Sequence, residues 1–274
     1  MTRTGPAEPD RPQSYREGHE RGLIPNPACV PLGTSGAASV GRAGRPPILR
    51  PMAGPDDEPP GATEWAVPGQ VGVGPWPGDP VEWPTDGRYD PELLAHGDTR
   101  NVVDAYRYWR RAAVVADLAA RAHPFHVAIE NFGHDHNIGT VVRTANAFGA
   151  AGVHIVGRRR WNRRGAMVTD RYLAVHHHDD IAGLADFAHD HDLVVVAVDN
   201  TPGAQRLETA RLPRKCLLLF GQEGPGVTDA AHAVAQMTVS IAQFGSTRSI
   251  NAGVAAGIAM HTWVRQHADL SRAW

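Results

Sequence analysis

Two short segments in the second half of the chain are entirely apolar: LVVVAV at 193–198 and CLLLF at 216–220. Uninterrupted runs of this length are typical of strands buried on both faces, as in parallel sheets. Segments with helical spacing of apolar residues alternate with these and other short runs, which predicts an α/β fold with a parallel sheet. The other predicted strands are 125–130, 153–156 and 237–241, and the predicted helices are 101–122, 137–150, 181–190, 227–235 and 249–268.

The first third of the chain differs in composition. Residues 1–91 hold 18 of the 22 prolines, are rich in glycine and show no apolar periodicity. Such a segment buries too little apolar area to offset the entropy lost on ordering. We therefore expect residues 1–98 to form a Pro/Gly-rich, largely disordered N-terminal arm and residues 99–274 to form the folded domain. Three tryptophans of this arm are either incidental members of a linker, which we favour, or dock on the folded part; they are Trp65, Trp76 and Trp83.

The charge of the chain is nearly balanced, with a net charge of −2 and an isoelectric point near 6.7. An RNA-binding function would therefore need a local basic surface. The only cysteines are Cys29 and Cys216, which excludes a multi-disulfide scaffold and a cysteine-rich zinc site and suits a reducing compartment. No apolar run is long enough to span a membrane, and the first residues lack the apolar stretch of a signal peptide. We expect a cytoplasmic protein without membrane contact.

Histidines occur in three clusters, His-Asp-His at 134–136 and 189–191 and His-His-His-Asp-Asp at 176–180. Adjacent histidines in a loop rarely converge on one ion, and no cysteine partners complete a zinc site. We expect no functional metal. Cys216 lies inside a predicted strand and is interpreted as a small core residue.

In parallel α/β sheets, ligands bind near the carboxyl ends of the strands. The strand at 216–220 leads into Gly-Gln-Glu-Gly-Pro-Gly, in which Gly221, Gly224 and Gly226 allow a tight turn close to a ligand and Glu223 supplies a carboxylate. No Gly-Lys-Ser/Thr follows, and the spacing is not that of a dinucleotide-binding loop. By itself this turn fits a structural role as well as a binding role.

The strand at 237–241 is followed by a polar turn and then by a helix rich in glycine and alanine. Gly245 breaks the chain, and Asn251 lies in the first turn of the predicted helix with its amide available. The small residues permit close packing against another helix, a ligand or a partner subunit. The candidate N-caps are Ser246, Thr247 and Ser249.

A third segment, 136–157, predicts a small-residue helix that leads into a strand. Asn137 stands at the start of the helix and Arg143 follows six residues later, a rotation of about 600°, so the two side chains point in different directions. By itself, Arg143 also fits an ordinary surface or salt-bridged arginine.

Together the three segments resemble the signature motifs of the SpoU/TrmH family of RNA ribose 2′-O-methyltransferases, in the SPOUT superfamily. The order and spacing of the motifs fit, and the resemblance covers residues 99–268 but not the Pro-rich arm. The matching residues are Asn137, Gly139, Arg143, Ala145, Phe148 and Gly149 in the first motif, Gly221, Glu223, Gly224 and Gly226 in the second, and Gly245, Ser249 and Asn251 in the third.

This resemblance implies a SPOUT fold with a deep C-terminal trefoil knot, S-adenosyl-L-methionine as cofactor, and a homodimer whose sites use both subunits. The implied reaction is methyl transfer to a ribose 2′-oxygen of tRNA or rRNA. Arg143 would bind the RNA phosphate and the 2′-oxygen with its guanidinium, or would itself remove the proton with help from the phosphate. The other implied catalytic residues are Asn137, acting across the dimer interface, Glu223, Ser249 and Asn251. The implied cofactor pocket is lined by Val198, Gly221, Ile241, Ser249 and Ile250.

One turn departs from the family pattern. The third motif usually starts with Ile-Pro-Met, whereas this chain has Ile241-Ala242-Gln243. The change removes a stiff proline and an apolar side chain beside the implied cofactor pocket. An alternative is therefore a catalytically inactive RNA-binding protein that retains the SPOUT fold. A nucleotide-binding α/β protein unrelated to RNA is disfavoured, because both common phosphate-loop patterns are absent.

A basic segment directly follows the strand at 153–156 and holds five arginines within seven residues. Arginines at this density can contact several phosphates, and the tryptophan among them could stack on an unpaired base. The alternative is a solvated basic loop without a partner. We expect an RNA-binding loop, and its residues are Arg158, Arg159, Arg160, Trp161, Arg163 and Arg164.

Overall fold

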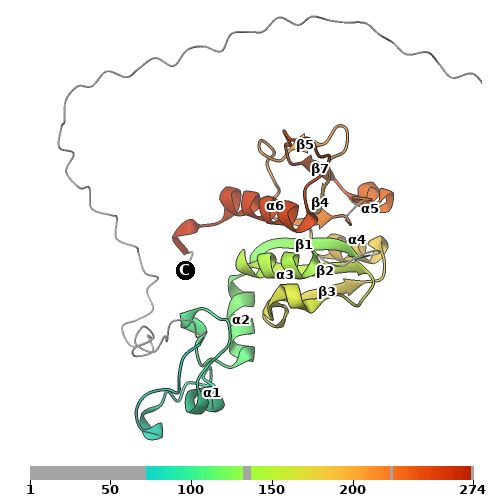
Figure 1. Ribbon diagram of the computed structural model, residues 1–274. Helices are drawn as coiled ribbons and strands as arrows, with labels where there is room; N and C mark the ends of the chain where they lie inside the picture. The colour runs from blue at the N-terminus through green and yellow to red at the C-terminus, as the bar shows by residue number, and fades with distance from the viewer. Residues whose placement is uncertain (1–71, 132–136, 223–224, 273–274) are drawn as a thin grey trace, which may run out of the picture. The chain divides into compact units, whose positions relative to one another are not determined.

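The computed structural model describes residues 72–131, 137–222 and 225–272 (Figure 1). Within these residues, a sheet of 7 strands has the order β3-β2-β1-β6-β4-β7-β5, and every pair of neighbours is parallel. The parallel α/β fold expected from the apolar runs is confirmed. The strands are β1 (His123–Asn131), β2 (Ala150–Gly157), β3 (Val175–His178), β4 (Val194–Val198), β5 (Gln205–Arg206), β6 (Cys216–Phe220) and β7 (Met237–Ser240).

Helices cover both faces of the sheet (Figure 1). One core lies between the sheet and the helices α3 (Ile138–Ala147) and α6 (Ala252–His267), and a second lies under α4 (Ile181–Asp190) and α5 (Asp229–Val234). Alternate side chains of β6 enter the two cores and all are buried, as its uninterrupted apolar sequence requires. The remaining helices and 3-10 turns are α1 (Pro91–His96), α2 (Arg111–Arg121), η1 (Pro80–Glu82), η2 (Asp104–Tyr106), η3 (Arg163–Ala166), η4 (Thr169–Arg171) and η5 (Leu270–Arg272).

Cys216 is fully buried in β6, and burial raises the pKa of its thiol to about 12. A thiol held neutral in this way behaves as a small apolar residue, so the interpretation as a core residue is confirmed. None of the helices in the described ranges is both long and apolar enough to cross a lipid bilayer.

The helix predicted over 101–122 is shorter than expected. It begins as α2 at Arg111, because the chain turns before that point. Tyr108 adopts a left-handed φ of 62° and donates its backbone N–H to the carboxylate of Asp98 at 3.0 Å. The prediction is wrong for residues 101–110, since a buried carboxylate rather than apolar periodicity decides the backbone conformation there.

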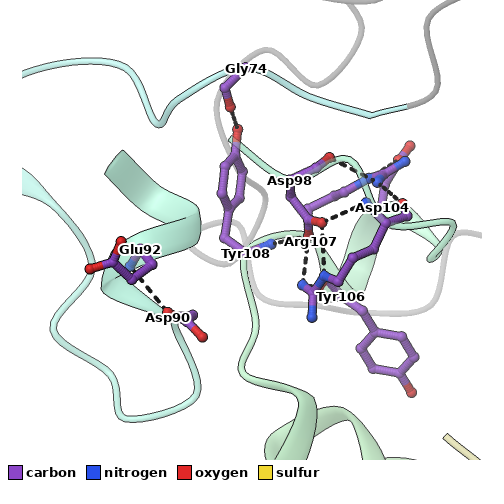
Figure 2. A network of polar contacts seen from close by, with 9 residues as sticks. Gly74, Asp90, Glu92, Asp98, Asp104, Tyr106, Arg107 and Tyr108 are labelled. Carbon is purple, nitrogen blue, oxygen red and sulfur yellow. Dashed lines mark hydrogen bonds and ion pairs between the residues drawn. The ribbon is translucent and has the colours of Figure 1, made fainter. Parts of the chain in front are cut away.

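Asp98 organises the segment before α2 (Figure 2). Its side chain is fully buried, pairs with the guanidinium of Arg100 (Oδ2 to Nη2, 2.6 Å) and accepts the backbone N–H groups of Arg100 and Tyr108. Burial favours the neutral acid, but these hydrogen bonds outweigh it and hold the pKa of the Asp98 carboxyl below its usual value. The Tyr108 hydroxyl donates to the carbonyl of Gly74 at 2.7 Å, which ties the start of the described chain to this cluster.

Part of the predicted arm is therefore structured. Residues 72–98 contain α1 and an antiparallel bridge between Val73 and Asp98. Trp76 packs edge-on against Tyr89 and Tyr108, with ring centroids 5.8 and 5.2 Å away. Trp76 is therefore docked on other residues, whereas the favoured prediction made it an incidental member of a linker. The remaining residues of the predicted arm, 1–71, include Trp65 and lie outside the described residues.

The strand β3 was not expected, because three of its four residues are histidines. Two of them join a cluster around His154 of β2, which is fully buried. The His154 ring is 2.9 Å from Nδ1 of His126 and 2.8 Å from Nε2 of His178, and it stacks on His176 at a centroid distance of 4.7 Å. Burial, aided by the neighbouring imidazoles, lowers the pKa of His126 to about 4 and of His154 to about 2. The cluster is thus neutral in the folded protein at neutral pH.

We expect acid to destabilise the fold through this cluster. The unfolded chain binds protons at its histidines below about pH 6.5, whereas the folded chain keeps His126 and His154 neutral. The free energy of unfolding should therefore fall as the pH drops below that value, by roughly 2 kcal/mol between pH 7 and pH 5 for each of the two histidines. Urea unfolding at the two pH values measures the difference.

A His154→Leu variant should show a smaller difference between the two pH values, whatever its stability at pH 7. As a matched control, His96→Ala should keep the wild-type difference, since the His96 side chain is 76% exposed. A pH dependence that is unchanged in His154→Leu would contradict the assignment.

Candidate active site

The carboxyl ends of β4, β6 and β7 and the start of α6 surround a cavity of about 510 Å³. This is the edge of a parallel sheet at which ligands bind, and a volume of several hundred Å³ suits a nucleoside-sized molecule. The family resemblance implies five residues for a cofactor pocket, and all of them line this cavity: Val198, Gly221, Ile241, Ser249 and Ile250.

The turn after β6 closes so tightly that only glycine fits at its base. Gln222 and Gly226 exchange two backbone hydrogen bonds of 3.1 and 3.2 Å. A Cβ atom on Gly221 would lie 2.0 Å from the carbonyl carbon of Gly226, which itself has a φ of +76°. Backbone groups therefore form this wall of the cavity, as expected where a chain must come close to a ligand. The other predicted members of the turn, Glu223 and Gly224, lie outside the described residues.

Two polar residues that the sequence analysis missed tie the loops around the cavity together. Asp199 lines the cavity and accepts hydrogen bonds from the backbone N–H of Val227 (3.3 Å) and from Nε2 of His232 (3.0 Å). Asn200 donates from Nδ2 to the carbonyl of Arg248 at 3.0 Å. Both directly follow β4, so the rule applied to the other strands would have found them.

Asn137 and Asn251, two predicted site residues 114 positions apart in the chain, are brought together. The amide Nδ2 of Asn251 donates to Oδ1 of Asn137 at 2.8 Å. Asn251 is also the N-cap of α6, since its Oδ1 accepts from the backbone N–H groups of Gly253 and Val254 at 3.0 and 3.2 Å. The prediction of Ser246, Thr247 or Ser249 as the cap is therefore wrong, because Asn251 itself occupies that position.

Arg143 lies on the exposed side of α3, next to the contact between α3 and α6. That contact is tight, since a Cβ atom on Gly253 would lie 3.2 Å from the Thr140 side chain. Arg143 is three residues after Thr140 and therefore on a neighbouring part of the same helix surface. The small residues of α6 thus serve the helix–helix packing that their composition suggested.

The departure at Ala242 has a structural counterpart. The backbone N–H of Ala242 donates to Oε1 of Glu208 at 2.9 Å. A proline at this position has no N–H and could not form that bond. A hydrogen bond to Glu208 therefore holds the turn in this chain, and Ile241 and Gln243 on either side still line the cavity.

The arginine loop follows β2, and its five arginines are all exposed. Trp161 is half-buried against the core, and the guanidinium of Arg163 lies 5.6 Å from the centroid of its ring. The structure thus gives Trp161 an anchoring contact, which differs from the free stacking surface that the sequence suggested. Gly139 and Gly165 touch through their backbones, where a Cβ atom on Gly139 would lie 2.7 Å from Cα of Gly165, so the loop packs against the start of α3.

Across the described residues, no group of three or more His, Cys, Asp or Glu side chains is arranged to hold a metal ion. The histidine cluster of β1, β2 and β3 directs its ring nitrogens at one another instead.

Comparisons with known proteins identify the family of this chain. The sequence profile of the SpoU rRNA Methylase family matches residues 124–261, half of the chain. The tRNA (guanosine(18)-2′-O)-methyltransferase of Escherichia coli strain K12 is 27% identical over 160 residues, which are 57% of this chain and 70% of the relative. An uncharacterized tRNA/rRNA methyltransferase of Mycolicibacterium vanbaalenii is 30% identical over 172 residues, which are 60% of this chain and 54% of the relative.

The solved structure of the TrmH/SpoU tRNA modifying enzyme of A. aeolicus matches with a TM-score of 0.52 at 20% identity, over 57% of this chain and 82% of that chain. This likeness shows a shared fold. The family profile runs from β1 into α6 and so contains the cavity, the arginine loop and the contact between Asn137 and Asn251. The chain therefore belongs to the SpoU rRNA Methylase family.

Proposed function

We propose that this protein is an S-adenosyl-L-methionine-dependent RNA methyltransferase that transfers a methyl group to a ribose 2′-oxygen of tRNA or rRNA. The observation that carries the proposal is the cavity at the ends of β4, β6 and β7, whose lining includes the five residues that the family resemblance implies for the cofactor. Family membership supports the reaction class, and the Escherichia coli relative is named for methylation of a tRNA ribose. Residues 99–274 are the proposed methyltransferase domain.

The residues around the cavity fit this cofactor. Val198, Ile241 and Ile250 offer apolar side chains for a flat base, and the glycine turn offers backbone groups at close range. The Asp199 carboxylate adds negative charge to the lining, which suits a cationic ligand. When bound, S-adenosyl-L-methionine supplies a methyl group activated by the positive charge on its sulfur.

In this proposal, Arg143 binds an RNA phosphate and the 2′-oxygen, and its guanidinium stabilises the negative charge that develops on that oxygen as the hydroxyl proton passes to water. Proton removal by Arg143 itself is the less favourable version, because an arginine is charged at neutral pH. Asn251 positions the start of α6 and holds Asn137 through the 2.8 Å hydrogen bond. Glu223 and Ser249 complete the proposed set.

A homodimer and a trefoil knot also belong to the proposal. Support for the dimer comes from an apolar stripe at four-residue spacing on and just before α6, where Ile250, Val254 and Ile258 are 36%, 54% and 38% exposed. A second copy would cover this stripe and bring Asn137 within reach of the partner's site.

Support for the knot comes from similarity to the family and from the insertion of β6 between β1 and β4. A cytoplasmic location follows from the proposed substrate.

Replacing Arg163 and Arg164 together with alanine should weaken RNA binding by about tenfold near physiological salt, because about two phosphate contacts are lost. For the same reason, the affinity of the variant for RNA should depend less steeply on salt concentration. Fluorescence anisotropy with labelled tRNA at several salt concentrations measures both effects. Affinity for S-adenosyl-L-methionine should not change, since neither arginine lines the cavity.

The matched control for this double variant removes two exposed arginines elsewhere, Arg111 and Arg211. It should bind RNA nearly as the wild type does. If the loop variant loses cofactor affinity to the same degree as RNA affinity, the proposed division between loop and cavity is wrong.

Two measurements test the function as a whole. Isothermal titration calorimetry should detect binding of S-adenosyl-L-methionine, and mass spectrometry of nucleosides should detect a new ribose-methylated nucleoside in tRNA or rRNA treated with protein and cofactor. If no binding of S-adenosyl-L-methionine is detected at millimolar concentration, the proposed methyltransferase activity is wrong. RNA binding in that case would point to the inactive RNA-binding protein.

A further inference from the structure

The last two residues of β1, Glu130 and Asn131, are polar and yet almost completely buried, with exposed fractions of 2% and 1%. Successive side chains of a strand point to opposite faces of the sheet. Ala128 belongs to the core under α4 and α5, and Ile129 belongs to the core under α3 and α6. Glu130 therefore faces the α4–α5 side, and Asn131 faces the α3–α6 side.

Glu130 is bonded to the far end of the glycine turn. Its carboxylate oxygens accept from the backbone N–H of Thr228 at 2.9 Å and from the Thr228 hydroxyl at 2.6 Å. Hydrogen bonds to a buried carboxylate are short and strong. Thr228 is also the N-cap of α5, and it directly follows Gly226 and Val227, which line the cavity. Glu130 thus fixes where the turn leaves the cavity.

Asn131 is bonded to the start of the arginine loop. Its Nδ2 donates to the carbonyls of Arg158 (2.6 Å) and Arg160 (3.3 Å), and its backbone carbonyl accepts the backbone N–H of Arg158 at 2.9 Å. These bonds fix the backbone between the two arginines while their side chains remain exposed. Two neighbouring residues of one strand therefore hold two different loops on opposite faces of the sheet.

We propose that Glu130 and Asn131 are positioning residues with separate tasks: Glu130 shapes the cofactor cavity, and Asn131 shapes the RNA-binding loop. This assignment rests on the proposed function. Both residues act through the backbone of a loop, and the reacting groups belong to other residues. The strand end thereby sets the position of the cofactor turn relative to the RNA loop.

Two variants of Glu130 with similar volume separate its hydrogen bonds from its bulk. Glu130→Leu removes both acceptors and should weaken binding of S-adenosyl-L-methionine by about tenfold or more, with RNA binding unchanged within about twofold. Glu130→Gln can still accept from the Thr228 N–H and can donate to the Thr228 hydroxyl. It should therefore retain cofactor affinity within about threefold.

Asn131→Asp is the reciprocal variant. It has the same shape, but a carboxylate oxygen replaces the donor that faces the two carbonyls, so the loop backbone is repelled. RNA binding should weaken by about fivefold to tenfold, and cofactor affinity should stay within about twofold of the wild type. If either residue had a purely structural role, its variant would instead weaken the binding of both ligands together or of neither.

Amide hydrogen exchange makes the test independent of the ligands. In Glu130→Leu, exchange should become faster at residues 225–231 and stay unchanged at residues 158–164. In Asn131→Asp, exchange should become faster at residues 158–164 and stay unchanged at residues 225–231. If the wild type does not bind S-adenosyl-L-methionine, the proposed function fails, and this exchange pattern still reports on the two loops. Faster exchange in both loops, or in neither, would overturn the separate tasks of Glu130 and Asn131.

Discussion

The Arg143→Ala variant should lose methyl transfer by about a thousandfold and still bind S-adenosyl-L-methionine within about twofold of the wild type. The guanidinium is the proposed donor to the ribose oxygen and its phosphate, and alanine offers neither charge nor hydrogen bond. Arg143 is exposed on α3, so its removal opens no cavity in the core and should change stability little. Single-turnover methylation of tRNA or rRNA measures the rate of methyl transfer, and calorimetry measures the affinity for S-adenosyl-L-methionine.

Two further variants make this result specific. Arg143→Lys keeps the charge but loses the planar fork, and it should recover only a small part of the rate. Arg111→Ala removes an exposed helical arginine away from the cavity and should methylate normally. Normal methylation by Arg143→Ala would remove the proposed role of this residue and leave the function of the protein in place.

The Gly221→Ala variant should lose the cofactor site. The added methyl group would lie 2.0 Å from the carbonyl carbon of Gly226 and 2.1 Å from its oxygen, and these are backbone atoms that cannot rotate away. The turn between them is held by the two hydrogen bonds between Gln222 and Gly226 and by Asp199. We expect cofactor affinity to fall by about a hundredfold and the free energy of unfolding by about 3 kcal/mol.

Calorimetry and urea unfolding measure the two effects on the same preparation. Gly87→Ala serves as the control, since a Cβ atom there meets nothing within 4 Å, and it should change neither quantity. If Gly221→Ala bound the cofactor with wild-type affinity, the turn after β6 would not form the wall of the cofactor site.

The sequence located five of the seven strands of the sheet, and the loops after β6 and β7 beside the cavity, because these features leave local patterns. Runs such as CLLLF identify buried strands without any knowledge of their neighbours. The turn at Gly221 and the polar segment around Asn251 followed directly from the strand ends. These features depend on residues close together in the chain, which is why periodicity and glycine placement were sufficient to predict them.

The contacts that hold the site in place were not predictable in this way. Glu130 meets Thr228 across 98 positions and Asn137 meets Asn251 across 114. A single acidic residue after an apolar strand does not indicate which distant backbone N–H it will accept. The break before α2 has the same origin, since Asp98 captures the N–H of Tyr108 although the apolar pattern continues through residues 101–122.

The place of β6 in the sheet also has a consequence for how the chain is made. β1 and β4 are both synthesised before β6, yet β6 pairs with each of them and separates them. Until residues 216–220 leave the ribosome, both neighbours present open, apolar strand edges, which readily pair with other chains. A nascent chain that stalls before residue 216 should therefore aggregate or require a chaperone.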